Sequence, residues 1–202
     1  MTRRRDRLQD LLKEVRACRI CKGLPLGPRP ILEAGKTAGA LIIGQAPGTR
    51  VHETGIPWND PSGDRLREWL QIDREAFYDP RRYAIVPMGF CYPGKGKSGD
   101  LPPREECAPQ WHERILAELP QVGLKLLIGR YAQSYYLAET QKKTLTETVR
   151  NWRDHPKDVV ALPHPSPRNN LWLRRNPWFE TEVLPLLRRR HRACLRKSRE
   201  TG

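Results

Sequence analysis

Two short turns rich in glycine and proline carry the residues of this sequence that are best placed for chemistry. They are GQAPG at 44–48 and HPSPRN at 164–169, and each directly follows an apolar run typical of a buried strand. Turns at the carboxyl ends of parallel strands form the ligand crevice of an open α/β sheet, so these two can meet at one site. A histidine opens the second turn, and the glycines of the first let a ligand approach the backbone closely. The sequence therefore predicts a catalytic cleft.

Four continuous apolar runs predict the strands that must position these turns. They lie at residues 40–43, 83–88, 124–128 and 159–162. Apolar residues at helical spacing predict a first helix within 6–17 and further helices at 65–70, 105–119, 130–138, 144–152 and 177–190. Strands that alternate with helices predict a three-layer α/β/α sandwich around a four-stranded parallel sheet.

The length and charge of the chain limit its organisation and its partners. A chain of 202 residues suits one domain, expected to span residues 1–190 and to be followed by a basic C-terminal tail at 191–202. We expect it to act as a monomer. The formal charge of +14 favours a polyanion such as nucleic acid as the partner, although solubility alone also accounts for such an excess.

The chain carries no sign of a membrane or secretory segment. Its apolar runs are all shorter than a membrane span, and its first residues lack the apolar core of a secretory signal. We therefore expect a cytoplasmic protein with no membrane partner. The five cysteines of such a protein favour metal or redox chemistry over disulfides.

Three blocks of sequence together resemble the uracil-DNA glycosylase superfamily. GQAPG, TGIPW at 54–58 and HPSPRN occur in the order of that family, and their joint occurrence is specific although each alone is weak. The resemblance, which spans residues 15–185, implies a DNA glycosylase of base excision repair. Such an enzyme hydrolyses the N-glycosidic bond of a flipped-out deaminated base, uracil or a related one, in damaged DNA. The alternative is a non-catalytic protein on the same fold that binds damaged bases or nucleic acid.

Four cysteines narrow the resemblance. Cys18 and Cys21 form a Cys-x-x-Cys pair, while Cys91 and Cys107 flank a long loop after the second predicted strand. This arrangement is similar to the iron-sulphur glycosylases of families four and five, and it implies a structural 4Fe-4S cluster held by these four side chains. Soft thiolates suit iron in such a cluster. A zinc ion bound by four cysteines is the competing interpretation, and four buried free thiols are the third, which the Cys-x-x-Cys spacing favours least. An electron-transfer iron-sulphur protein is a third candidate function beside the glycosylase and the binder.

The resemblance also assigns roles within the cleft. His164 matches the histidine that hydrogen-bonds the leaving base as negative charge builds up on it, a role that a neutral imidazole can fill. Trp58 stands where relatives carry a phenylalanine that stacks on the extruded base, and Asn59 beside it is expected to contact the base as well. The first turn, which lies under the flipped base, contributes Gly44, Gln45, Ala46, Pro47 and Gly48.

Two positions depart from the family pattern. Val51 occupies the place of the water-handling glutamate of family four, and valine cannot act on water. His52, Glu53 and Asp60 are the nearby groups that could act in its place. Asp60 matches the catalytic aspartate of family five, so we expect Asp60 to handle the water, with Glu53 as the second candidate. The other interpretation of Asp60 is a helix cap. Pro87 replaces the uracil-reading asparagine, and because proline has no side-chain amide, hypoxanthine and xanthine remain candidate bases beside uracil.

The residues around these positions complete the expected DNA contacts. The second turn resembles the loop that enters the minor groove and fills the gap left by the flipped nucleotide. Its residues after the histidine are Pro165, Ser166, Pro167, Arg168 and Asn169. Met88 and Phe90 suit either an apolar pocket wall or ordinary strand packing.

Overall fold

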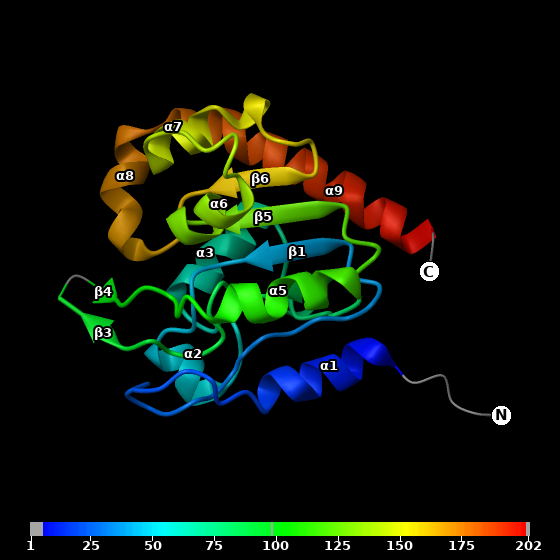
Figure 1. The fold of residues 1–202 in the computed structure, drawn as a ribbon. Helices are drawn as coiled ribbons and strands as arrows, with labels where there is room; N and C mark the ends of the chain where they lie inside the picture. The colour runs from blue at the N-terminus through cyan, green and yellow to red at the C-terminus, as the bar shows by residue number, and fades with distance from the viewer. Residues whose placement is uncertain (1–5, 98, 201–202) are drawn as a thin grey trace.

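The protein is a parallel sheet with helices on both faces (Figure 1). The computed structural model describes residues 6–97 and 99–200, with side chains as far as residue 196. The sheet has four parallel strands in the order β2, β1, β5, β6, which are Tyr83–Ile85, Ala40–Ile43, Leu124–Ile128 and Val159–Leu162. This arrangement confirms the predicted α/β class and the four-stranded sheet.

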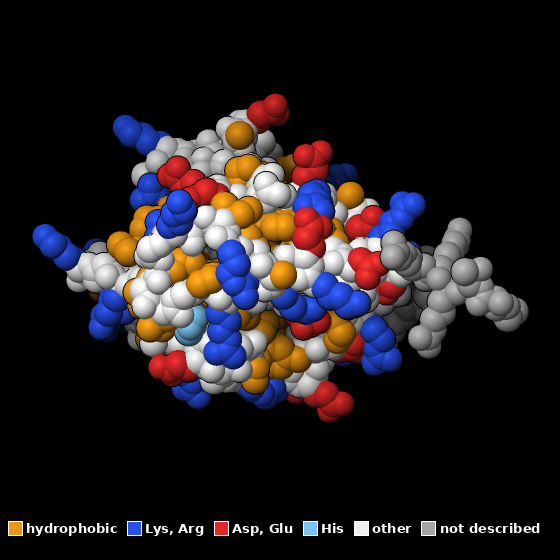
Figure 2. Space-filling view, turned by 60° about the horizontal axis from the view of Figure 1, so that its bottom comes forward, with side chains coloured by type: hydrophobic (Ala, Val, Ile, Leu, Met, Phe, Trp, Pro, Cys, Tyr) orange, Lys and Arg blue, Asp and Glu red, His pale blue; other side chains and the backbone are white. Residues whose placement is uncertain are grey.

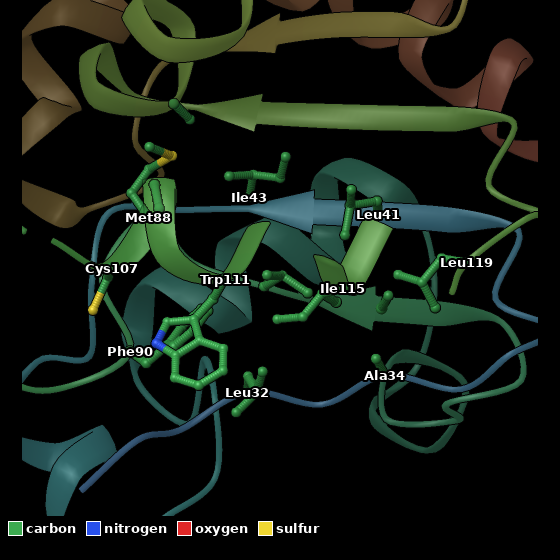
Figure 3. Close-up of a cluster of buried hydrophobic side chains, with 14 of the residues drawn as sticks. Leu32, Ala34, Leu41, Ile43, Met88, Phe90, Cys107, Trp111, Ile115 and Leu119 are labelled. Carbon is green, nitrogen blue, oxygen red and sulfur yellow. The ribbon is translucent and has the colours of Figure 1, made fainter. Parts of the chain in front are cut away.

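Side chains of β1 alternate between two buried layers, because successive residues of a strand point to opposite faces. Leu41 and Ile43 belong to one layer, while Ala40 and Ile42 belong to the other. The first layer is covered by α1 (Arg7–Arg16), α5 (Cys107–Ala117) and α6 (Arg130–Tyr136). Figure 3 shows Trp111 and Ile115 of α5 in this layer, below β1 in the view.

The second layer lies beneath helices from the middle and the end of the chain. It contains side chains of α3 (Pro61–Leu70), α4 (Arg74–Phe77), α7 (Leu145–Arg150) and α9 (Leu184–Glu200). A π-helical turn, Phe179–Val183, leads into α9, and the Phe179 ring packs edge-on against Trp69 with centroids 4.9 Å apart. The strands are buried on both faces, which explains their continuous apolar runs.

Several element boundaries differ from the predicted ones for local reasons. Helix α3 begins at Pro61 rather than 65, because the Asp60 side chain accepts a hydrogen bond from the Gly63 amide and caps the helix. Strand β2 ends at Ile85 rather than 88, just before Pro87, which has no amide hydrogen to donate. Helix α7 carries a capping box between Thr144 and Glu147, which fixes its start.

The boundary expected at residue 190 falls inside α9, which continues to Glu200. His191 is 2% exposed, and Cys194 donates a hydrogen bond to the Gly39 carbonyl at 2.8 Å, so the first part of the expected tail packs on the domain. Residues 1–5 of the expected domain and 201–202 of the expected tail lie outside the described residues.

Short elements that the sequence did not predict gather at the carboxyl ends of the strands. They are α2 (Thr49–Thr54), the 3₁₀ turn Pro167–Asn169, α8 (Asn170–Arg175), and a hairpin of β3 (Lys95–Gly96) and β4 (Gly99–Asp100). Figure 1 shows the hairpin projecting on the side toward which the strand arrows point. None of the helices in the described part of the chain has the length and apolar character needed to cross a bilayer.

Basic side chains are spread over the surface rather than confined to one element. Figure 2 shows Lys and Arg side chains distributed across the face that is turned forward, with fewer carboxylates and with apolar areas between them. On this face, the basic side chains therefore cover a broad area.

Candidate active site

The two turns meet at the carboxyl edge of the sheet. Residues of both line a narrow pocket of about 40 Å³, here called the inner pocket. A wider groove of about 500 Å³, the outer groove, shares part of that lining. The residues common to both are Gln45, Ala46, Gly48, Asp60 and His164.

Trp58 and His164 lie face to face in the inner pocket. Their ring centroids are 5.6 Å apart with the planes inclined by 25°, although the residues are far apart in sequence. Because the inner pocket is also lined by the turn at 44–48, the expected convergence of the two turns is present. A base that entered the inner pocket would contact both the indole and the imidazole, because both line that pocket.

The backbone of Trp58 is strained, and two glycines make room for it. Its φ of 56° lies in the left-handed region, which costs a residue with a side chain roughly 1–2 kcal/mol. A Cβ at Gly63 would lie 1.8 Å from the Trp58 carbonyl oxygen, and one at Gly44 would lie 2.8 Å from the indole. Glycine is thus required at both positions if the indole is to sit beside His164.

Neighbouring side chains hold the strained turn in place. The Tyr78 hydroxyl donates a hydrogen bond to the Pro57 carbonyl at 2.9 Å. The buried Arg67 donates to the Trp58 carbonyl at 3.5 Å and pairs with Asp64. Because these contacts come from α3 and α4, the second layer of the fold fixes the indole.

His164 is positioned as a neutral hydrogen-bond donor. Burial lowers the pKa of its imidazole, Asp60 opposes that shift, and Arg168 adds to it. The Asn169 side chain donates to the His164 carbonyl at 2.7 Å and fixes the start of the turn. A neutral imidazole can stabilise a developing anion without transferring a proton.

Asp60 serves as a cap and also lines both cavities. Its Oδ1 accepts a hydrogen bond from the Gly63 amide at 2.8 Å. It lines the inner pocket and the outer groove together with His164. The two interpretations of Asp60 are therefore compatible, because one carboxylate can cap the helix and face the groove.

Val51 lies in the inner pocket, whereas the predicted site residues Glu53 and Asn59 lie outside both cavities. Val51 is 5% exposed and forms part of the inner pocket wall. Glu53 is exposed on α2, and the Asn59 side chain accepts a hydrogen bond from Arg74 at 2.9 Å. Neither Glu53 nor Asn59 is among the residues that line the inner pocket or the outer groove.

Pro87 lines the inner pocket, while the residues after it face the core. The Pro87 carbonyl accepts a hydrogen bond from His112 Nε2 at 3.0 Å. Burial lowers the pKa of His112 to about 4, so this imidazole is neutral. Met88 and Phe90 are buried in the first layer, which agrees with strand packing and not with a pocket wall.

The loop expected to contact DNA is held by Arg65, a residue that the sequence did not indicate. Arg65 donates to the Pro165 carbonyl at 3.3 Å, to the Ser166 carbonyl at 3.0 Å and to the Asn170 side chain at 2.8 Å. Ser166, Pro167, Arg168 and Asn169 line the outer groove. No local pattern points to Arg65, because its partners are about a hundred residues away.

The sequence also gave no indication of Asp100, which lines the outer groove from the β3–β4 hairpin. Burial raises the pKa of its carboxyl, Arg168 opposes that shift and Asp60 adds to it. The glycines of the segment GKGKSGD were a signal for the hairpin, but not for what it would face.

The four cysteines of the resemblance lie close together. The thiols of Cys21 and Cys107 are hydrogen-bonded, and the same neighbourhood includes Cys18 and Cys91. Burial raises the pKa of Cys21, of Cys91 and of Cys107, the last to about 12. All are free thiols, and no group of three or more metal-ligating side chains in the described ranges is arranged around a single ion site.

The family of the chain follows from a family comparison. Residues 33–188 match the uracil DNA glycosylase superfamily, a span that covers most of the 202 residues. The chain belongs to this superfamily. The matched span contains both turns, Trp58 and Asp60, but it begins after Cys18 and Cys21.

Proposed function

We propose that the protein is a DNA glycosylase that removes a deaminated base from a flipped-out nucleotide. The observation that supports this proposal most directly is the stacked pair of Trp58 and His164 beside the glycine-rich turn. An aromatic face binds a base by stacking, and a fixed donor stabilises the base as it departs. Superfamily membership and the net charge of +14 fit a DNA substrate.

The proposed reaction breaks the bond between C1′ of the sugar and the base nitrogen. The bonding electrons leave with the base, whose negative charge is stabilised by a hydrogen bond from His164. Water then forms the new bond to C1′, a carboxylate accepts the water proton, and solvent protonates the base. Asp60 is the carboxylate that sequence analysis assigns to this step, and Glu53, exposed on α2, is the second candidate.

A panel of oligonucleotides tests this proposal. Each would contain one uracil, hypoxanthine or xanthine, and abasic sites would be measured in a single turnover. We expect cleavage of at least one base by the natural protein, and a loss of about 10²–10³-fold in His164→Ala. Since Pro87 offers no side-chain amide, uracil need not be the preferred base.

The second candidate function is a non-catalytic binder of damaged bases, which the apolar Val51 in the pocket wall favours. Binding that is tight for a damaged base, with no abasic product from any oligonucleotide, would support the binder and contradict the enzyme. His164→Ala separates the two further, because a binder loses affinity whereas the enzyme loses mainly the rate of bond cleavage.

We also propose that Cys18, Cys21, Cys91 and Cys107 hold a 4Fe-4S cluster of structural role. The thiols fit such a group because they gather from three segments into one neighbourhood, in which Cys91 and Cys107 are buried and Cys18 and Cys21 are half-buried. A cluster there would join the segment after α1 to the start of α5. Iron and sulphide analysis of protein purified without oxygen, with absorbance near 400 nm, tests this; zinc in place of iron would contradict it.

A further inference from the structure

A hairpin brings a second carboxylate to the site. The Leu101 amide donates to the Gly94 carbonyl at 2.8 Å, which closes the hairpin loop. The Gln45 side chain donates to the Leu101 carbonyl at 3.1 Å. Gln45 belongs to the turn under the expected base position, so the hairpin is attached directly to the catalytic edge of the sheet.

Asp100, the last residue of this hairpin, lies against that turn. A Cβ at Gly48 would come within 3.3 Å of Asp100 Oδ2, so the carboxylate rests over a glycine backbone. The Arg168 guanidinium lies 2.6 Å from the place of a Cβ at the neighbouring Gly99, and its charge acts on the Asp100 carboxylate. Asp100 therefore stands between the turn after β1 and the loop expected to contact DNA.

Neither Val51 nor Asp60 excludes a further carboxylate as the group that handles the attacking water. Val51 is apolar, and Asp60 already caps α3 through Oδ1. Asp60, Asp100 and His164 line the outer groove, and Asp60 and His164 also line the inner pocket. A base held by His164 in the inner pocket leaves its sugar at the mouth of that pocket, in the outer groove, where Asp100 is found.

We propose that Asp100 is the carboxylate that faces C1′ of the flipped nucleotide, stabilises the cationic sugar and accepts the proton of the attacking water. This inference rests on the proposed function. It assigns the water-handling role to Asp100, which the sequence did not indicate, in place of Asp60 or Glu53. The water oxygen bonds to C1′ as the bond to the base breaks, and the water proton passes to Asp100. Asp60 then keeps its capping role and contributes charge to the same groove.

The test compares two DNA ligands that differ only in charge at the sugar. One carries a cationic pyrrolidine and the other a neutral tetrahydrofuran at the position of the damaged nucleotide. We expect the natural protein to prefer the cation and Asp100→Asn to lose about 10-fold of that preference, with little change for the neutral ligand. Asp10→Asn, on the exposed surface of α1, is the matched control and keeps the preference.

Single-turnover excision in the same variants separates this inference from the proposed function. We expect Asp100→Asn to excise about 10²-fold more slowly, and Asp60→Asn to be affected less. Normal excision and normal cation preference in Asp100→Asn would overturn the inference and leave the glycosylase in place. A natural protein that excises no base, yet loses its cation preference in Asp100→Asn, would contradict the enzyme and support the placement of Asp100. Equal binding of the two ligands by the natural protein overturns the inference outright.

Discussion

Two histidines at opposite edges of the sheet share a lowered pKa but differ in what surrounds them. His164 follows the carboxyl end of β6 and is partly exposed in the site, beside Trp58 and Asp60. His191 of α9 lies against Tyr83 at the start of β2 and is 2% exposed. Burial is the main cause of both shifts, and it lowers the pKa of His191 to about 4. A perturbed pKa alone therefore does not identify the functional histidine.

The surroundings of the two rings make the distinction. The Nε2 of His191 is hydrogen-bonded to the Tyr83 hydroxyl, and the two rings stack at 5.7 Å. His164 instead stacks on Trp58, which has a strained backbone and whose carbonyl oxygen would lie 1.8 Å from a Cβ at Gly63. Strain and close backbone approach at the carboxyl edge mark a site, whereas a ring that is buried and hydrogen-bonded to Tyr83 at the amino edge marks a structural contact.

Replacing each histidine by alanine should produce opposite effects. We expect His164→Ala to lose about 10²–10³-fold in excision rate with a small change in the free energy of unfolding. His191→Ala should cost about 2–3 kcal/mol of stability, because it leaves a cavity and an unpaired Tyr83 hydroxyl, yet excise normally when folded. Urea denaturation and single-turnover kinetics measure the two. If His191→Ala slowed excision as much as His164→Ala, the comparison would fail.

Gly63, near the carboxyl edge of the sheet, and Gly123, near its amino edge, differ in the space around them. A Cβ at Gly63 would meet the Trp58 carbonyl at 1.8 Å, whereas one at Gly123 would meet only Cys194 Sγ, at 3.4 Å. We expect Gly63→Ala to displace the indole and to lower the excision rate by about 10-fold or more. Replacing glycine by alanine within a helix usually stabilises the helix by about 1 kcal/mol, so a loss here would come from the contact with Trp58. Gly123→Ala is the control, and excision like that of the natural protein is expected. Indole fluorescence would report a displacement of Trp58. A Gly63→Ala variant with unchanged fluorescence and an unchanged excision rate would contradict the requirement for glycine at position 63.

The pH dependence of stability tests the buried, neutral state of His191. Its pKa of about 4 lies below the ordinary value of about 6.5 in the unfolded chain, as does that of His112. The unfolded state therefore binds more protons between these values, and stability is full above about pH 6.5 and falls as the pH drops toward 4. Each histidine contributes up to about 1.4 kcal/mol per pH unit. His191→Gln should reduce this slope, measured by urea denaturation at several pH values; an unchanged slope would show that His191 is not held neutral.

The sequence by itself determined the class of fold and the two turns that line the inner pocket. Apolar runs, interrupted only by Lys125 in β5, mark β1, β5 and β6 to the residue, because both faces of the sheet are buried. Since ligands bind at the carboxyl ends of parallel strands, the sequence alone predicted that His164 and the turn at 44–48 would lie close together. These features depend on local pattern and on topology, both of which the sequence carries.

Only the tertiary structure decided which polar side chains share the groove. Arg65 supports a loop about a hundred residues away, and Asp100 reaches Gly48 because a short hairpin folds back on the sheet. Glu53 is close to the site in sequence, yet it lies on the exposed side of α2. The direction of a side chain on a short helix or hairpin is set by packing between distant segments, which sequence spacing does not encode.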